Sequence, residues 1–190
     1  YLQSVMTHLT GHEDKTMCKA LEKDLSVCAT DFDGNMRANL FVPFGMTSSG
    51  YLYREGMARP HDEKGHMLAD RKATPIEAAR YGSAGELHTT PTDYARFLIE
   101  LLAPGPSDQY LLTKASTEEM VRPQAKLTDS LSWGLGWAIE HEKSGGDLIT
   151  HSGDNPGFKA MTAASLERKT GFIIMTNGDR GFDEIIANVV

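Results

Sequence analysis

The hydrophobic pattern of this chain changes its period near residue 130, and this change constrains the fold more than any other feature of the sequence. Before that point apolar residues recur at helical spacing, and after it they alternate with small or polar residues, as half-buried strands require. Short strand-like segments then follow at residues 135–140, 148–151, 158–166 and 171–176, with a turn at Ser144–Gly146. Sequential strands with short links pair antiparallel, so we predict an antiparallel meander.

The segment after His88 carries the clearest helix signal. Thr90 is the predicted N-cap, Pro91 lies in the first turn where its missing N–H is not needed, and Asp93 is predicted to complete a capping box. The predicted core face of this helix consists of Tyr94, Phe97, Leu98, Leu101 and Leu102. We expect this face to pack on the sheet, because an apolar helical stripe must be buried against another element.

Other parts of the chain show weaker helical signals. Residues 2–9 and 13–28 are amphipathic, a short helix is predicted with its cap at Ser116–Glu119, and an apolar stripe that begins at Phe182 is predicted to cover one face of the sheet. Residues 29–73 lack a clear period. We interpret this stretch as a wrapping or functional loop.

These elements indicate an α/β (α+β) fold in which an antiparallel sheet packs with helices. We predict a helical and loop-rich part at 1–130 and a sheet with a C-terminal helix at 131–190, together forming one compact unit. Helical spacing starts at Leu2 without a cap ahead of it, and the last apolar stripe reaches Val190. We therefore expect a fragment of a larger domain that is incomplete at its N-terminus.

Composition excludes several classes of partner. The 190 residues carry a net charge of −7, with 40% hydrophobic and 24% charged residues, as in an ordinary globular domain. Basic residues are interspersed with acids, so we predict no nucleic-acid partner. No apolar run approaches the roughly 20 residues of a membrane span. Cys18 and Cys28 lie ten positions apart in a predicted helix, about 15 Å along its axis, which is too far for a disulfide.

Metal binding has little support in the sequence. His8 and His12 have a spacing that can place two imidazoles on one helix face, but Gly11 interrupts the helix and a third ligand is missing. A polar cluster in the loop region consists of His61, Asp62, Glu63 and His66. We interpret both groups as surface residues, and we predict neither a metal nor a cofactor.

The strongest candidate site lies where a predicted strand ends, at His151-Ser152-Gly153-Asp154. A self-sufficient nucleophile is not evident. The chain contains no G-x-S-x-G elbow and no Ser-x-x-Lys motif, and Thr16–Lys19, the nearest pattern, lies on the buried stripe of a predicted helix. Ser152 cannot pair with His151, because neighbours on a strand point to opposite faces. Lys169-Thr170-Gly171 matches a K-T-G triplet, but we interpret it as a polar turn between two apolar strands.

Several short motifs in a fixed order resemble the C-terminal part of the serine β-lactamase and penicillin-binding-protein superfamily. The motifs are Leu9–Gly11, Pro43–Thr47, Ala84–Leu87, Thr90–Leu98, Trp133–Trp137, His151–Gly153, Pro156–Phe158 and Thr176–Gly178. Within that superfamily the chain is most similar to the class C β-lactamase-like branch, which includes D-aminopeptidases and family VIII-type esterases. Each motif alone is weak, but the shared order makes the resemblance specific.

The resemblance implies an active site between an antiparallel sheet and a helical part. It implies a serine nucleophile from an S-x-x-K motif, which would precede Tyr1, and it places the family's third motif at His151-Ser152-Gly153. In that arrangement His151 orients the substrate carboxylate or carbonyl, and Ser152 forms a hydrogen bond with the substrate. Gly153 allows close approach, and the backbone N–H of Asp154 is an oxyanion donor. The structural alternative is that His151 merely ends a strand.

The sequence therefore predicts the C-terminal portion of a β-lactamase-like serine hydrolase of bacterial type, acting on a small amide or ester and inactive by itself. The alternative is a non-catalytic binding domain that keeps the fold, with a missing N-terminal segment or a second copy of the chain as its partner. The compartment stays open, because relatives occur in both periplasm and cytoplasm. The roles of Glu86, where relatives carry a glycine, and of Lys159 also stay open.

Overall fold

The computed structural model describes Gln3, Val5, Met6 and residues 32–69, 82–104, 112–142 and 146–189. Gln3, Val5 and Met6 are helical, in agreement with the first predicted helix. Several sequence predictions lie outside the described residues. These are the helix at 13–28 with its cysteines, His8, His12, Thr16–Lys19, Val190 and most of the turn at Ser144–Gly146.

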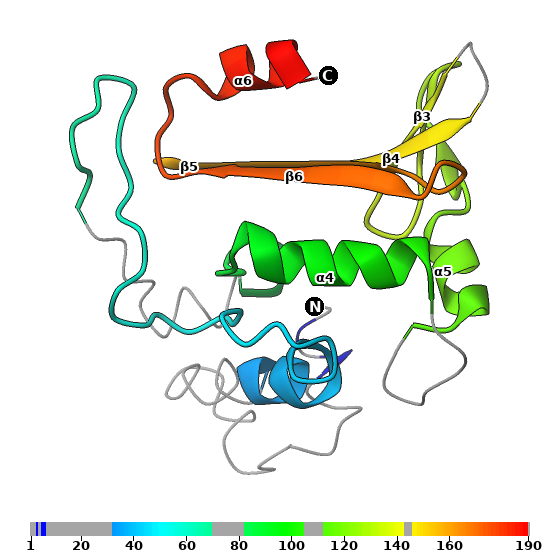
Figure 1. Cartoon of the computed structure of the whole chain (residues 1–190), viewed down its shortest axis with the longest axis horizontal. Helices are drawn as coiled ribbons and strands as arrows, with labels where there is room; N and C mark the ends of the chain where they lie inside the picture. The colour runs from blue at the N-terminus through cyan, green and yellow to red at the C-terminus, as the bar shows by residue number, and fades with distance from the viewer. Residues whose placement is uncertain are drawn as a thin grey trace.

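The helices pack around a single sheet. α4 (Pro91–Leu102) lies on one face of the sheet and α6 (Phe182–Val189) on the side of the other face (Figure 1). None of the described side chains of α6 is buried, so the predicted packing of the last apolar stripe on the sheet stays a prediction. α5 (Lys114–Met120) lies next to the short strands at one end. A further helical stretch from Phe32 ends in the π-helix η1 (Arg37–Phe41).

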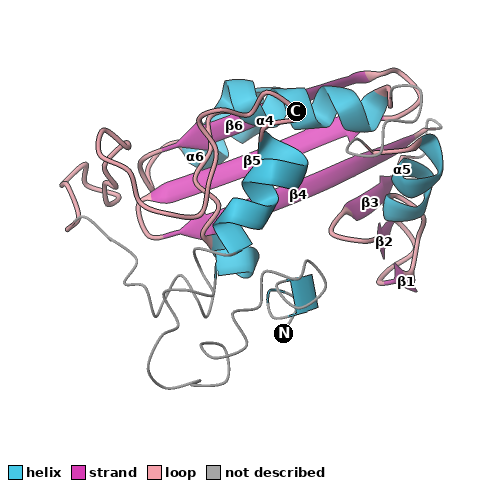
Figure 2. Ribbon diagram, turned by 90° about the horizontal axis from the view of Figure 1, so that it is seen from below, coloured by secondary structure: helices cyan, strands magenta, loops and turns pink. Residues whose placement is uncertain are grey.

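The sheet is an antiparallel meander in which each strand pairs with the next. Its strands are β1 (Ala125–Lys126), β2 (Leu131–Trp133), β3 (Ala138–His141), β4 (Asp147–Asn155), β5 (Phe158–Ser165) and β6 (Thr170–Thr176). They lie side by side in this order (Figure 2). The predicted topology is confirmed.

Two differences concern the start of the sheet. β1 and β2 escaped the sequence prediction because they are only two and three residues long, too short for a period to show. The predicted strand at 135–140 begins only at Ala138, because Leu135 is 52% exposed and Gly136 adopts a φ of +84° in a turn. The division at residues 130 and 131 stays a prediction, although the sheet starts at β1.

α4 separates two hydrophobic clusters. On its sheet side, three leucines of the helix pack with four residues of the sheet: Leu98, Leu101, Leu102, Trp137, Ile139, Ile149 and Ala164. The second cluster contains Phe32, Phe41, Phe44, Met46 and Tyr51. Phe97 joins the two, because its ring stacks on Phe44 at 6.0 Å and on Trp137 at 6.5 Å between ring centroids. Residues of the apolar face predicted for this helix thus contribute to the hydrophobic clusters on both sides of α4.

The helix ends agree only in part with prediction. Thr90 caps α4 as expected, since its hydroxyl accepts a hydrogen bond from the backbone N–H of Asp93. The prediction that Asp93 completes a capping box is wrong, because its carboxylate accepts from Ser48 and Ser49 of a distant loop. α5 begins at Lys114 with Thr113 as its cap rather than at Ser116–Glu119, because the Thr113 hydroxyl accepts from the Ser116 N–H.

Only the first residue of the K-T-G triplet lies in the predicted turn, because Thr170 and Gly171 belong to β6. Lys169 lies in the connection between β5 and β6 with a φ of +56°, and Thr170 starts β6. The Lys169 Nζ donates to the carbonyl oxygen of Leu102 at 2.6 Å. A cation at this position satisfies a free carbonyl at the C-terminus of α4 and opposes the helix dipole. Lys169 therefore holds the helix to the sheet and has no part in the candidate site.

Candidate functional site

The second half of β4 has an open edge. β3 pairs with β4 only from Asp147 to Thr150, whereas β5 pairs with β4 along its whole length to Asn155. From His151 onward, β4 therefore has no strand on its other side among the described residues. An unpaired strand edge presents backbone N–H and C=O groups that another chain or a ligand can use.

His151 stands at the start of this edge in a fixed orientation. Its Nδ1 lies 2.7 Å from the carbonyl oxygen of Gly136, and because a carbonyl only accepts, Nδ1 is the donor. The imidazole also contacts Trp133 and Trp137, at 6.1 Å and 6.3 Å between ring centroids. In the neutral ring this leaves the Nε2 lone pair without a partner among the described residues. His151 is thus an exposed imidazole whose free nitrogen can accept from, or when protonated donate to, a ligand.

The residues after His151 are exposed and differ in direction. His151 is paired in register with Thr162 and Ser152 with Met161, so their side chains point to opposite faces of the sheet, as the sequence predicted. The position that a Cβ atom would occupy on Gly153 has no neighbouring heavy atom within 4 Å. A ligand can therefore approach the backbone at Gly153 without meeting a side chain.

Asp154 belongs to a charge cluster that the sequence did not predict. Its carboxylate accepts from the Lys159 Nζ, which also lies 3.5 Å from Asp179 Oδ1. The hydrogen bond to Asp154 raises the pKa of Lys159. Asp179 in turn accepts from the backbone N–H of Gly157 at 2.9 Å. Lys159, whose direction was open from the sequence, therefore fastens the end of the β4–β5 hairpin rather than extending freely into solvent.

Two loops border this end of β4. The Asn155 Nδ2 donates to the carbonyl oxygen of Gly85 at 3.0 Å, which brings the loop with Glu86 next to the strand. On the other side, Gly157 is buried against Pro60 and His61. The family motifs at Ala84–Leu87 and Pro156–Phe158, distant in sequence, thus meet at one end of the sheet.

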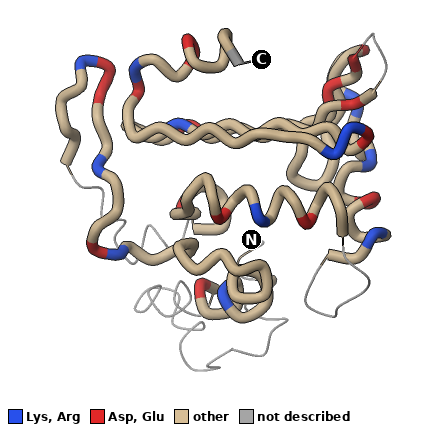
Figure 3. Tube along the Cα trace, viewed as in Figure 1, with Lys and Arg blue, Asp and Glu red and all other residues tan. Residues whose placement is uncertain are grey.

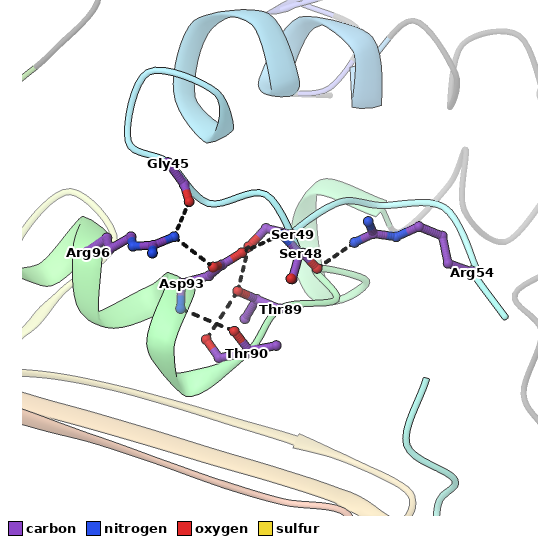
Figure 4. A network of polar contacts seen from close by, with 8 residues as sticks. All are labelled: Gly45, Ser48, Ser49, Arg54, Thr89, Thr90, Asp93 and Arg96. Carbon is purple, nitrogen blue, oxygen red and sulfur yellow. Dashed lines mark hydrogen bonds and ion pairs between the residues drawn. The ribbon is translucent and has the colours of Figure 1, made fainter. Parts of the chain in front are cut away.

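A buried polar network fixes the loop that leads into this region (Figure 4). The Asp93 carboxylate, in a residue only 3% exposed, accepts from the Ser48 N–H at 2.7 Å and from the Ser49 hydroxyl at 3.0 Å. Arg96 lies 3.4 Å from the same carboxylate and donates to the carbonyl oxygen of Gly45. Because the network contains a buried charge with several donors, it holds the loop firmly on the N-terminus of α4.

The polar cluster at His61–His66 has a structural role. The Asp62 carboxylate accepts from the backbone N–H groups of Lys64 and His66, each at 2.8 Å, and closes a turn between His61 and Met67. These bonds lower the pKa of Asp62. His61 Nδ1 lies 3.0 Å from the carbonyl oxygen of Asn177. The interpretation of this group as surface loop residues rather than as a metal site stays a prediction.

Three features of the described part of the chain bear on other partners. In the ranges that the structure describes, no cluster of three or more His, Cys, Asp or Glu side chains is placed to hold a metal ion. Within those same ranges, no helix has both the length and the apolar character needed to cross a membrane. Basic and acidic residues are mixed along the described trace, and neither kind gathers on one side of it (Figure 3).

Comparison with known proteins gives a consistent result. Residues 25–189 match the family model described as Beta-lactamase. No curated protein matches the chain. Among solved structures, it is similar to a penicillin binding protein from Bacillus halodurans, with a TM-score of 0.67, 18% identity, and coverage of 86% of this chain and 51% of that one.

Two other solved structures show the same likeness. A Beta-Lactamase/D-Alanine Carboxypeptidase from Pseudomonas syringae has a TM-score of 0.67 and 14% identity, covering 86% of this chain and 54% of that one. A D-amino acid amidase from Ochrobactrum anthropi SV3 has a TM-score of 0.57 and 19% identity, covering 80% and 45%. The chain thus spans about half the length of these structures. The predicted fold class is confirmed.

Proposed function

The chain belongs to the beta-lactamase family, and from this premise we propose that His151–Asp154 form the substrate-orienting wall of an acyl-transfer site. The serine hydrolase of which they are part cleaves a small amide or ester through an acyl-enzyme. The observation that carries the proposal is the geometry of His151, which is held by the Gly136 carbonyl at 2.7 Å beside the open backbone at Gly153.

Each residue of the wall has a chemical role in this proposal. The free Nε2 of His151 binds the carboxylate or carbonyl oxygen of the substrate, and Ser152 offers a hydroxyl from the opposite side of the strand. The backbone N–H of Asp154 serves as one oxyanion donor. The ion pair between the Asp154 side chain and Lys159 holds this residue in a fixed position. The nucleophile comes from a Ser-x-x-Lys motif outside the 190 residues, which contain none.

The wall can be tested in the isolated chain by ligand binding. Both tryptophans of the chain contact His151, so a ligand that binds Nε2 should change tryptophan fluorescence. We expect titration with an N-acyl amino acid to give a saturable change, which His151→Ala weakens by about tenfold or more, as loss of a charge-assisted hydrogen bond requires. His66→Ala, at another exposed histidine, is the matched control. Equal affinity in His151→Ala would contradict the proposal.

Catalysis is tested in the longest reading frame that contains this sequence. If that frame supplies a Ser-x-x-Lys motif, its product should hydrolyse a chromogenic cephalosporin, a p-nitrophenyl ester or a D-amino acid amide. His151→Ala should lower kcat/KM by about 100-fold, the usual contribution of a positioned proton-transfer group. Turnover by the isolated chain that His151→Ala abolishes would show that the nucleophile lies within the 190 residues, against the proposal.

The outer edge of β6 supports a second candidate, a non-catalytic interaction domain that retains the fold. β6 pairs with β5 and with no other described strand, and its sequence from Thr170 to Thr176 has no charged residue. Such an edge favours pairing with another strand, from a second copy of the chain or from an N-terminal segment. Light scattering after size exclusion separates the cases, because a strict monomer at micromolar concentration would contradict self-pairing.

A further inference from the structure

Three side chains at the other end of β4 form a second hydrogen-bonded series. The Ser132 hydroxyl lies 3.0 Å from His141 Nε2, and His141 Nδ1 lies 2.9 Å from Asp147 Oδ1. The three residues come from β2, β3 and β4. A serine, a histidine and an aspartate are thus joined in that order, through the two different nitrogens of one imidazole.

The register of the sheet produces this arrangement. Ser132 is paired with Ile139, and His141 follows Ile139 by two positions. The side chains of Ser132 and His141 therefore point to the same face of the sheet. Asp147 is paired directly with His141 across the β3–β4 hairpin. The series therefore lies on rigid strands rather than on loops, which holds its geometry.

The order of the groups determines where the protons lie. The Asp147 carboxylate can only accept, so in neutral His141 the ring proton belongs to Nδ1. Nε2 then carries a lone pair, and the Ser132 hydroxyl must be the donor of the 3.0 Å bond. This is the arrangement in which a histidine removes the proton of an attacking serine while a carboxylate fixes the tautomer and stabilises the imidazolium.

The surroundings limit the reaction that such a serine can perform. Ser132 is 4% exposed, whereas the side chains of His141 and Asp147 are 34% and 52% exposed, so only a small reagent can reach the hydroxyl from the histidine side. The neighbouring backbone N–H groups of Leu127 and Gly134 are already bonded, to Leu131 and Trp137. Because these two donors are already used, they cannot stabilise an oxyanion, so acylation should be slower than in a complete hydrolase site and turnover poor.

We propose that Ser132 is a reactive serine that accepts an acyl group from a small activated ester. The Ser132 Oγ attacks the ester carbonyl carbon and forms the new C–O bond, while its proton moves to His141 Nε2. The bond to the aryl oxygen breaks with its electron pair, and the departing aryl oxide takes the proton from His141. Serine and aryl ester thus become acyl-serine and phenol, with Asp147 stabilising the charged imidazole in between.

This site is separate from the His151 wall. Asp147 and His151 lie four residues apart on β4, about 13 Å at roughly 3.3 Å per residue. An ester assay on the isolated chain would therefore report Ser132 chemistry, which His141 controls, as well as any chemistry that His151 controls. A substitution of His141 and a substitution of His151 therefore distinguish the two proposals, because neither histidine is part of the other site.

The test is acetylation of the intact chain by p-nitrophenyl acetate near neutral pH, followed by mass spectrometry and peptide mapping. We expect one acetyl group on Ser132, added about tenfold or more faster than on the exposed Ser130, whose hydroxyl lies 3.4 Å from that of Thr128 and next to no described histidine. Asp147→Asn should slow this acetylation by about tenfold or more, and His141→Gln should slow it at least as much.

Matched variants keep the outcome decisive. Ser132→Ala should remove the label, and Ser130→Ala should leave its rate unchanged. Asp147 is half exposed, so Asp147→Asn should fold even if the variants at the buried Ser132 do not, and circular dichroism checks this. No label on Ser132, or an unchanged rate in a folded Asp147→Asn chain, would overturn the proposal.

Discussion

Asp93 and Asp154 show how burial assigns opposite roles to the same residue type. Each carboxylate has a basic side chain nearby, Arg96 for Asp93 and Lys159 for Asp154. Asp93 is 3% exposed and accepts hydrogen bonds from Ser48 and Ser49, which lie in a loop 45 and 44 positions earlier in the chain. Asp154 lies on an exposed strand edge, and Lys159 is its partner.

The difference separates what holds the fold from what a ligand can reach. In the Asp93 network, the buried carboxylate is bonded to another part of the protein, and its removal leaves buried donors without an acceptor. At the β4 edge, the backbone of the strand is held in place, but side-chain atoms stay exposed to solvent. A binding site needs such exposed atoms, and the buried network provides the rigid frame behind them.

The largest expected effect is that of Asp93→Ala. This change leaves the Ser48 N–H and the Ser49 hydroxyl without their acceptor, so we expect a loss of about 3 kcal/mol in the free energy of unfolding. Asp154→Ala is the matched control, with a loss within about 0.5 kcal/mol, because an exposed ion pair contributes little. Urea unfolding followed by circular dichroism measures both. Equal losses would remove the contrast between the two regions.

Gly157→Ala should have the next largest effect. Gly157 has a φ of +78°, and a Cβ there would lie 2.4 Å from Pro60 Cβ, so we expect a loss of about 2 kcal/mol. Gly153→Ala is the control, since that position has open space and should change stability by less than about 0.5 kcal/mol. The control should nevertheless weaken ligand binding in the fluorescence titration. If Gly153→Ala binds as wild type does, substrate does not approach this backbone.

A smaller effect concerns pH. Burial lowers the pKa of His88, which is hydrogen-bonded through its backbone to Gly50. A lowered pKa means that the unfolded chain takes up a proton first, so the stabilisation is complete above the ordinary value of about 6.5. It is lost as pH falls through that value towards the lowered pKa. His88→Asn should make the decline in unfolding free energy between about pH 7 and 5 shallower. An unchanged slope would assign the decline to other groups.

The smallest expected effect on stability is that of His151→Ala. The side chain is exposed and makes one hydrogen bond within the part of the chain that the structure describes, to Gly136, so we expect a loss of about 1 kcal/mol or less. The midpoint of thermal unfolding provides the measurement. A loss as large as that of Asp93→Ala would indicate that His151 is mainly a structural residue. The alternative that the sequence left open, that His151 ends a strand, is wrong, because β4 continues to Asn155.

Local signals in the sequence were sufficient for much of the fold. Alternation from Leu148 onward and short links predicted the antiparallel order, and the Thr90-Pro91 pair predicted the start of α4. These features depend on neighbours within a few positions, which is why pattern reasoning finds them. β1 and β2 were missed because strands this short have no measurable period.

The candidate site was predictable as a location but not as a geometry. The resemblance placed His151 at a strand edge, yet nothing local indicated that the Gly136 carbonyl and two tryptophans hold its ring. The Ser132–His141–Asp147 series left only a faint trace in the sequence. His141 and Asp147 flank the predicted Ser144–Gly146 turn at positions that can face each other.

The sequence by itself determined the family, the order of the strands and the cap of α4. These depend on periodicity and on residues adjacent in the chain. Only the tertiary structure decided the partner of each polar side chain: Asp93 with a distant loop rather than its own helix, Lys159 with Asp154 and Asp179, and Ser132 with His141. Such partners are set by strand register and loop docking, which bring together residues that no local pattern connects.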